Sequence, residues 1–288
     1  MDVRSALFMP GSNARALAKS ATLKADAIII DLEDSVAPSL KAQARDQAAK
    51  ALQQTDYGYR IKALRINADN PQWQADDLAA AAIGAPDFIV LPKVKSASDI
   101  ARLSDDMSRF AALDGCAIWA MIETPQALIN ANDIAASADA HPRLKALLIG
   151  INDLALACGT PMQAERSYFI PWLMSLVLAA KAHGLLILDS VFNDINDPAG
   201  FGRECKQGFD MGMNGKTLIH PSQLDTANAA FTPSLAAVEH AREVVRAFAQ
   251  PENADKGVIS VRGLMTERLH LEMANELLQR VERLDARK

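Results

Sequence analysis

Acidic side chains stand directly after several short apolar runs of this 288-residue chain. Glu123 follows the run Ala117–Ile122, and Asp153 comes shortly after the run Ala146–Ile149. Mg²⁺ is bound by one or two carboxylates, and its other positions are left to water and substrate oxygen. Each carboxylate alone is equally well explained as a helix cap or an ion-pair partner. Their places after two consecutive runs favour a magnesium site formed by Glu123 and Asp153 together.

A second acidic cluster, Asp31-Leu32-Glu33-Asp34, follows the apolar run that ends at Asp31. So many carboxylates need a cation nearby, and one role for Asp34 is to hold the waters of a bound metal. A helix cap, or an ion pair with Lys41 or Arg45, explains Asp34 equally well.

Arg65 ends the third apolar run and is the natural partner of an anion. Its planar guanidinium binds a carboxylate or a thioester oxygen with fixed geometry. A plain ion pair with Asp31 or Glu33 is the alternative, and both contacts are compatible. His220 precedes Pro221 at a predicted helix start, and a capping role explains it better than acid–base chemistry.

Composition and missing motifs exclude several classes of function. The net charge is −5 and no long basic run is present, which argues against nucleic-acid and anionic-membrane partners. No apolar stretch is long enough for a membrane span, and the first residues do not form a signal peptide. The three cysteines lack C-x-x-C spacing, so we expect free thiols and a cytoplasmic protein. There is no G-x-S-x-G, H-E-x-x-H or P-loop motif.

The polar residues must be positioned by the apolar runs, of which eight recur along the chain. Continuous apolar runs of this length predict strands that are buried on both faces of a parallel sheet. Asn70, Thr124 and Asp197 each precede a proline, the arrangement of a capped helix start. This alternation predicts a (β/α)₈ barrel, whose catalytic groups gather at the C-terminal ends of the strands. A doubly wound open sheet is the alternative, which the absence of G-x-G-x-x-G after the first run disfavours. The predicted strands are Ala6–Met9, Ala27–Asp31, Ala63–Ile66, Phe88–Leu91, Ala117–Ile122, Ala146–Ile149, Leu185–Leu188 and Phe209–Met213.

We assign residues 1–228 to the barrel and residues 229–288 to a C-terminal helical extension, here called the arm. The arm is predicted to contain a helix up to about residue 250, an apolar turn at Val258–Val261, and an amphipathic helix over about 266–283. An apolar helix face needs a surface to pack on. That surface is either the arm's own barrel or, as we favour, a neighbouring subunit.

Five segments of the sequence carry a recognisable pattern: Arg4–Gly11, Ala25–Pro38, Leu91–Val94, Ile122–Pro125 and Asn214–Pro221. They resemble the citrate lyase β-subunit-like family, within the superfamily of HpcH/HpaI aldolases and malyl-CoA and citramalyl-CoA lyases. They occur in that family's order and at its spacings, over residues 4 to about 270. The resemblance implies a (β/α)₈ barrel, Mg²⁺ bound by Glu123 and Asp153, a catalytic Arg65 and a CoA-thioester substrate. It also implies a homo-oligomer, a trimer or a hexamer, in which the C-terminal segment reaches over the neighbour's site.

The arm carries one departure from the family pattern. Members that cleave acyl-CoA C–C bonds usually have an Asp at the end of a Gly-x-Met-hydrophobic-Asp stretch. In this sequence that place is taken by Glu267, one methylene longer, and Leu269 stands where a proline is usual. By this resemblance Glu267 of a neighbouring subunit protonates the substrate's methylene carbon.

The remaining candidates are of two kinds: acids at the C-terminal ends of the strands, here called the mouth of the barrel, and cations that could bind phosphate. Asp31 and Glu33 are predicted to be catalytic acids beside Arg65. CoA phosphates need positive charge, for which Arg15 and Lys19 after the first strand and Lys93 nearer the mouth are candidates.

The predicted reaction is cleavage of a 3-hydroxyacyl-CoA of the citramalyl-, malyl- or citryl-CoA type to acetyl-CoA and a 2-oxo acid. Mg²⁺ would chelate the carboxylate and the hydroxyl of the substrate, and Arg65 would stabilise the enolate that departs. A citrate lyase β subunit acting on a citryl acyl carrier protein and a class II aldolase acting on a free hydroxy acid are alternatives. A non-catalytic assembly subunit is the least favoured, because clustered carboxylates beside an arginine are typical of a ligand site.

Overall fold

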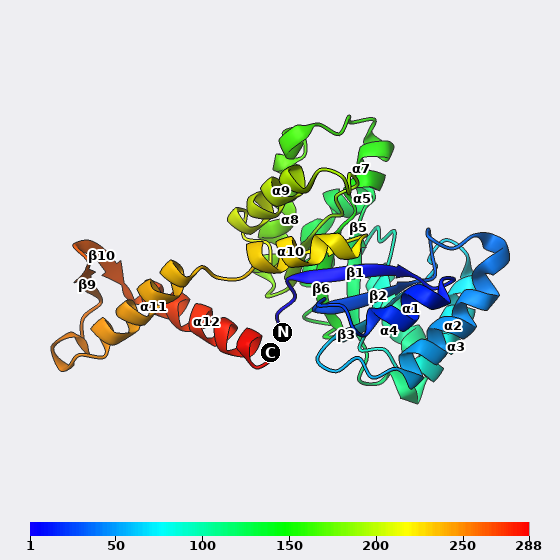
Figure 1. Ribbon diagram of the computed structural model, residues 1–288, viewed down its shortest axis with the longest axis horizontal. Helices are drawn as coiled ribbons and strands as arrows, with labels where there is room; N and C mark the ends of the chain where they lie inside the picture. The colour runs from blue at the N-terminus through cyan, green and yellow to red at the C-terminus, as the bar shows by residue number, and fades with distance from the viewer. Residues whose placement is uncertain (288) are drawn as a thin grey trace. The chain divides into compact units, whose positions relative to one another are not determined.

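Eight parallel strands form a closed barrel in the computed structural model, which describes residues 1–287 (Figure 1). Each strand pairs with the next, and β1 closes the barrel by pairing with β8. The predicted (β/α)₈ barrel is therefore confirmed, and the open-sheet alternative is wrong. The strands are β1 Ser5–Pro10, β2 Ala27–Asp31, β3 Ile61–Arg65, β4 Phe88–Leu91, β5 Ala117–Ile122, β6 Leu144–Ile149, β7 Leu186–Asp189 and β8 Gly215–Leu218.

Helices follow the strands and cover the outside of the barrel (Figure 1). Asn70, Thr124 and Asp197 cap three of them through side-chain oxygens, as predicted, with proline at the first helical position. The imidazole of His220 caps the 3₁₀ helix Pro221–Gln223, which confirms its structural role. The helices of this unit are α1 Ala14–Ser20, α2 Lys41–Gln54, α3 Pro71–Gly84, α4 Ala97–Met107, α5 Pro125–Ile129, α6 Ala131–Ala136, α7 Ile151–Cys158, α8 Ile170–Ala182, α9 Pro198–Asp210 and α10 Leu224–Ala230.

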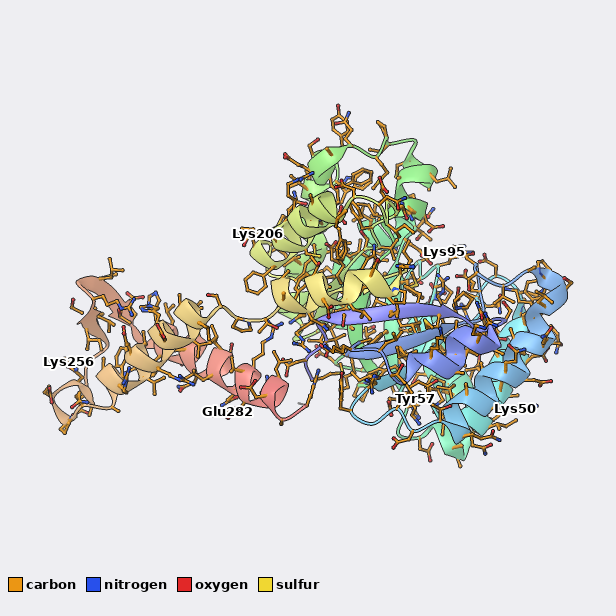
Figure 2. The ribbon with its side chains drawn as sticks, in the orientation of Figure 1. Lys50, Tyr57, Lys95, Lys206, Lys256 and Glu282 are labelled. Carbon is orange, nitrogen blue, oxygen red and sulfur yellow. The ribbon has the colours of Figure 1, made fainter. Side chains whose placement is uncertain are left out.

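Alternate residues of the strands face two different cores. One core lies between the strands and the helices, and the other fills the barrel interior, where Phe88 and Trp119 stack with ring centroids 4.8 Å apart. Charged side chains such as Lys50 and Lys206 lie on the outer surface of the helices (Figure 2). Because the interior core is apolar, ionisable side chains that face the inside of the barrel are expected at the strand ends.

The eighth predicted strand, Phe209–Met213, is wrong. Phe209 lies in the last turn of α9 and packs edge-on against Phe231, with ring centroids 6.2 Å apart. The true strand β8 contains Lys216, which is fully buried among acidic partners. An apolar-run criterion selects the apolar residues at the end of a helix over a strand that carries a lysine.

The chain divides into two compact units, Val3–Phe231 and a second unit made of Met1–Asp2 with the chain from Thr232 onward. The second unit contains α11 Leu235–Phe248, the hairpin of β9 Val258–Val261 and β10 Leu264–Glu267, and α12 Arg268–Asp285. A two-residue turn with positive φ at Arg262 and Gly263 joins the hairpin strands. Val258–Val261, predicted as an apolar turn, is strand β9, and β10 was not predicted. No helix among residues 1–287 is long and apolar enough to cross a membrane.

Candidate active site at the mouth of the barrel

Arg65 and Asp31 form a buried bidentate ion pair at the C-terminal ends of β2 and β3. The strand register places the two residues side by side. Nε of Arg65 lies 2.6 Å from Oδ1 of Asp31, and Nη2 lies 2.7 Å from Oδ2. Burial by itself would raise the pKa of Asp31, but the bound guanidinium outweighs it and lowers that pKa. Asp31 therefore stays ionised and holds Arg65 in one orientation.

Glu33 connects Arg65 to Lys93. Its two oxygens lie 3.1 Å from Nη1 of Arg65 and 2.8 Å from Nζ of Lys93. Burial raises the pKa of Glu33 to about 7, although both cations favour its charged form. Asp34 is half exposed and lies 3.7 Å from each of the same two cations. The predicted mouth acids thus surround one arginine and one lysine.

Lys41 and Arg45, the partners considered for Asp34, are engaged elsewhere. Nζ of Lys41 donates to the carbonyl oxygens of Leu32 and Glu33 at 2.7 Å each, which secures the loop that carries the acids. Arg45 pairs with Asp77 at 2.6 Å.

Lys93 contributes both its ammonium and its backbone to the mouth. The ammonium also lies 3.0 Å from Asp69, so it is shared by several carboxylates, which together raise its pKa. The backbone has a φ of +52°, the left-handed region, and its N–H donates to Oε1 of Glu123 at 2.7 Å. The charge of Lys93 could be recognised from the sequence, but the role of its amide could not, because a residue type shows neither the left-handed backbone nor the N–H donor.

Glu123 and Asp153 follow the paired strands β5 and β6, whose last partners are Ile122 and Ile149. Burial and the nearby carboxylates of Glu33 and Asp153 raise the pKa of Glu123 to about 8. Burial and the charge of Asp34 also raise the pKa of Asp153. Within residues 1–287 neither carboxylate has a cation at ion-pair distance. Two neighbouring carboxylates without a counter-charge fit a divalent cation.

The number of donors agrees with magnesium. Among the described residues no cluster of three or more His, Cys, Asp or Glu side chains could hold a metal. Mg²⁺ commonly uses one or two carboxylates and keeps water and substrate oxygen as its other ligands. The pair Glu123 and Asp153 supplies that minimal set.

A cavity of about 280 Å³ lies beside this cluster. Glu33, Asp34 and Lys93 line it from the predicted site, together with Lys41 and Asp69. Arg15 and Lys19 both lie exposed on α1, which follows β1. Glu267 belongs to the other unit, at the end of β10, where its backbone N–H donates to Nδ1 of His270 at 2.9 Å.

A second ionic cluster, on the outside of the barrel, was missed by the sequence analysis. Asp189 ends β7 but faces the helices, where it pairs with Arg166 at 2.6 Å and Lys216 at 3.1 Å. Lys216 also lies 2.7 Å from Glu204. These two cations lower the pKa of Asp189, against the effect of burial. The balanced charges indicate a structural role between β7, β8 and α9.

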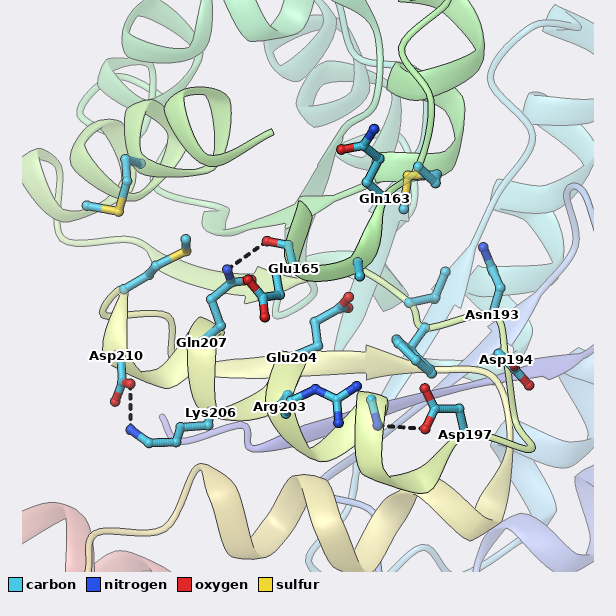
Figure 3. Close-up of a pocket in the computed structure, with 17 residues that line it drawn as sticks. Gln163, Glu165, Asn193, Asp194, Asp197, Arg203, Glu204, Lys206, Gln207 and Asp210 are labelled. Carbon is cyan, nitrogen blue, oxygen red and sulfur yellow. Dashed lines mark hydrogen bonds and ion pairs between the residues drawn. The ribbon is translucent and has the colours of Figure 1, made fainter. Parts of the chain in front are cut away.

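A cavity of about 720 Å³ adjoins this outer cluster (Figure 3). Glu165, Glu204 and Gln207 line it, and the side-chain amide of Gln207 donates to the carbonyl of Glu165. None of the predicted site residues lines this cavity. The chemistry that the sequence predicts therefore belongs to the mouth and not to this larger space.

A parallel (β/α)₈ barrel whose mouth contains two carboxylates and a fixed arginine is typical of metal-dependent barrel enzymes. Residues 4–221 match the HpcH/HpaI aldolase/citrate lyase family. The chain belongs to this family, which confirms the predicted membership.

Similar proteins cover nearly the whole chain. A (3S)-malyl-CoA thioesterase of Cereibacter sphaeroides is 43% identical over 98% of this chain and 96% of its own. A citrate lyase subunit beta of Escherichia coli is 33% identical, over 97% and 93%. An L-malyl-CoA/beta-methylmalyl-CoA lyase of C. sphaeroides is 32% identical, over 98% and 96%.

A solved structure extends the comparison to ligands. The protein CitE of Mycobacterium tuberculosis, in complex with magnesium, acetoacetate and coenzyme A, matches with a TM-score of 0.77 and 29% identity. The match covers 97% of this chain and 98% of that one. The comparisons confirm the predicted lyase family. The neighbouring CitE structures hold magnesium, the metal that was predicted for this chain.

Proposed function

We propose that this lyase cleaves a 3-hydroxyacyl-CoA of the malyl-, citramalyl- or citryl-CoA type to acetyl-CoA and a 2-oxo acid. The observation that carries the proposal is the uncompensated pair Glu123 and Asp153 at the same mouth as the immobilised Arg65. The names of the lyase relatives supply the substrate class.

Each mouth residue has a distinct task in this reaction. Glu123 and Asp153 would hold Mg²⁺, which would supply Lewis-acid polarisation of the substrate's carboxylate and hydroxyl oxygens. The hydroxyl loses its proton, its oxygen becomes the carbonyl of the 2-oxo acid, and the electrons of the broken C–C bond pass to the thioester enolate. Arg65 stabilises the negative charge on the enolate oxygen. Asp31 positions Arg65, and Glu33 is the mouth carboxylate available for the hydroxyl proton.

The enolate is completed to acetyl-CoA by a proton at its methylene carbon. We assign that proton to Glu267 of a neighbouring subunit. Exposed apolar side chains near Glu267 support an arm that packs on another subunit of a trimer or hexamer. They are Leu264, Met265, Leu269 and Met273, each between 49% and 69% exposed.

Subunit exchange tests this arrangement. Glu123→Gln and Glu267→Gln are each expected to be inactive alone. Mixed after dissociation and reassociation, they should regain activity, because some sites then combine an intact Glu123 with a neighbour's intact Glu267. No recovery, in a mixture shown to exchange subunits, would refute donation between subunits.

We further propose that Arg15, Lys19 and Lys93 hold the phosphates of coenzyme A, with Asp34 ordering water at the metal. Arg15 and Lys19 are exposed cations on one helix, whereas the ammonium of Lys93 is already shared among carboxylates. Reversing both charges of α1 should therefore raise KM for the thioester and leave Mg²⁺ affinity unchanged. Reversing exposed Lys24, which precedes β2 at the opposite end of the barrel, is the control.

Free cysteines at positions 116, 158 and 205 support a reducing, cytoplasmic location.

The central experiment measures 2-oxo acid release from malyl-, citramalyl- and citryl-CoA with Mg²⁺ present. Activity on at least one substrate, abolished by EDTA and restored by Mg²⁺, is expected. No turnover, or turnover that EDTA does not affect, would refute the proposal. Turnover only of the acyl carrier protein thioester, or only of a free hydroxy acid, would instead support the alternative lyases.

Thioester hydrolysis is a second candidate function. It is favoured by the 43% identity to a (3S)-malyl-CoA thioesterase, compared with 32–33% for the lyase relatives above. The same mouth could polarise the thioester carbonyl with Arg65 while water attacks. Product analysis with malyl-CoA as the substrate separates the two reactions. Hydrolysis of malyl-CoA gives free CoA and malate, whereas its C–C cleavage gives acetyl-CoA and glyoxylate.

A further inference from the structure

Gly150 lies directly against the side chain of Glu123. Since Ile122 pairs with Ile149, Glu123 and Gly150 are the next residues of two neighbouring strands. A Cβ atom built on Gly150 would lie 2.4 Å from Cβ of Glu123 and 2.6 Å from its Oε2. Both distances are far below van der Waals contact, so no side chain fits at position 150 while Glu123 stays in place.

The backbone conformation does not require glycine here. Gly150 has φ −107° and ψ 77°, angles that do not need the positive φ reserved for glycine. The missing side chain is therefore the relevant property. The absence of a side chain leaves Oε2 of Glu123 room to lie against Gly150. Gly150 directly precedes α7, the helix that carries Asp153.

Lys93 restrains the other oxygen of the same carboxylate. Its N–H donates to Oε1 of Glu123 at 2.7 Å from a backbone with φ +52°. A left-handed lysine is held there by its surroundings, since such a conformation is disfavoured for residues with a Cβ. Glu123 is thus confined on one side by an amide donor and accommodated on the other by a glycine.

We propose that Gly150 is a positioning residue for the metal ligand Glu123, and that the amide of Lys93 acts with it. Together they restrain both oxygens of Glu123, Oε1 through the amide donor and Oε2 through the space beside Gly150. This inference rests on the proposed role of Glu123 as a magnesium ligand. It assigns to Gly150 a role in metal affinity beyond strand packing.

The test is calorimetric titration of the metal-free protein with Mg²⁺ alone, which needs no substrate and no turnover. Gly150→Ala is expected to raise the Kd for Mg²⁺ by about 10–100-fold, as for other groups that orient a metal ligand. Gly115→Ala is the matched control, because an added Cβ there meets nothing within 4 Å. Circular dichroism must show that both variants are folded at the titration temperature.

A second pair of variants tests the backbone amide of Lys93 by itself. This pair also serves as the test if the Gly150→Ala variant does not fold. Lys93→Gly and Lys93→Val both remove the ammonium, but only glycine adopts the left-handed conformation readily. Lys93→Gly should keep the amide in place, whereas Lys93→Val should displace it. The Kd for Mg²⁺ is expected to be at least 5-fold higher in Lys93→Val than in Lys93→Gly.

Glu123→Gln separates failure of this inference from failure of the proposed metal site. If Glu123→Gln loses Mg²⁺ binding while Gly150→Ala and Lys93→Val bind normally, the positioning role is overturned and the metal site stands. If Glu123→Gln itself binds Mg²⁺ normally, Glu123 is not a ligand and both proposals are wrong.

Discussion

The ion pair between Asp31 and Arg65 gives a prediction whose size follows from the structure. Asp31→Asn keeps the volume of the side chain but removes its charge. The two short contacts with Arg65, at 2.6 and 2.7 Å, then lose their charge assistance. The backbone N–H groups of Glu33 and Ser35, at 2.9 and 3.1 Å from the carboxylate, also lose a charged acceptor.

The expected loss of stability is at the low end of the range for a broken buried pair. Removing one partner of such a pair typically costs about 3–5 kcal/mol, because the other charge is left buried. Glu33, 3.1 Å from Arg65, still compensates part of that charge, so we expect about 3 kcal/mol. For a unit of this size about 1 kcal/mol lowers Tm by about 2–4 °C, which gives a decrease of about 6–12 °C.

The assay is thermal unfolding followed by circular dichroism at several pH values. The pKa of Asp31 is lowered on folding, so the pair stabilises the protein above the pKa of the unfolded state and loses this effect as pH falls through the folded pKa. The Tm difference should therefore be largest at neutral pH and shrink below about pH 4. Asp105→Asn, at an exposed position on α4, is the control. A Tm difference under about 2 °C at pH 7 would contradict the reasoning.

Three further changes test other parts of the molecule. Lys216→Met leaves Asp189 and Glu204 with Arg166 alone, so urea denaturation should show a loss of about 3–5 kcal/mol while calorimetry shows unchanged Mg²⁺ affinity. Gly11→Ala would place a Cβ 2.8 Å from the carbonyl oxygen of Asp31, and thermal denaturation should show a loss of about 1–3 kcal/mol; unaltered stability would mean that the loop yields freely. Asp153→Asn should weaken Mg²⁺ binding more than 10-fold with little change in Tm, and equal binding would remove Asp153 from the metal site.

The fold could be predicted wherever burial makes a strand continuously apolar. Each of the first seven strands contributes apolar residues to both cores, although β3 also contains Lys62 and Arg65 and β6 contains Lys145. β8 does not, because Lys216 is buried by ion pairs instead of apolar contacts. The hairpin of the arm was missed for a related reason: β10 exposes Leu264 and Met265 and carries polar Thr266 and Glu267, so no apolar run marks it.

The composition of the site could be predicted, but its internal arrangement could not. Strand ends in a parallel barrel meet at one face, which is enough to group Arg65, Glu123 and Asp153 from sequence. The choice of Asp31 as the bidentate partner of Arg65 depends on strand register, which residue types do not encode. The roles of Gly150 and of the Lys93 amide depend on contacts of a missing side chain and of a backbone group, for which a sequence offers no signal.

The distribution of charge restricts how the substrate can bind. Residues 229–288 contain nine acidic and nine basic side chains, so the net charge of −5 falls entirely on residues 1–228. At the mouth, the carboxylates outnumber the two cations Arg65 and Lys93, even after a divalent ion is added. Such a mouth attracts Mg²⁺, and the bound Mg²⁺ in turn attracts the reacting end of the substrate. The same negative charge repels a polyphosphate. Of the three cations proposed for the phosphates of coenzyme A, this charge balance favours Arg15 and Lys19 over Lys93, which lies within the acidic cluster. This is the physical reason to test α1 separately from the metal site.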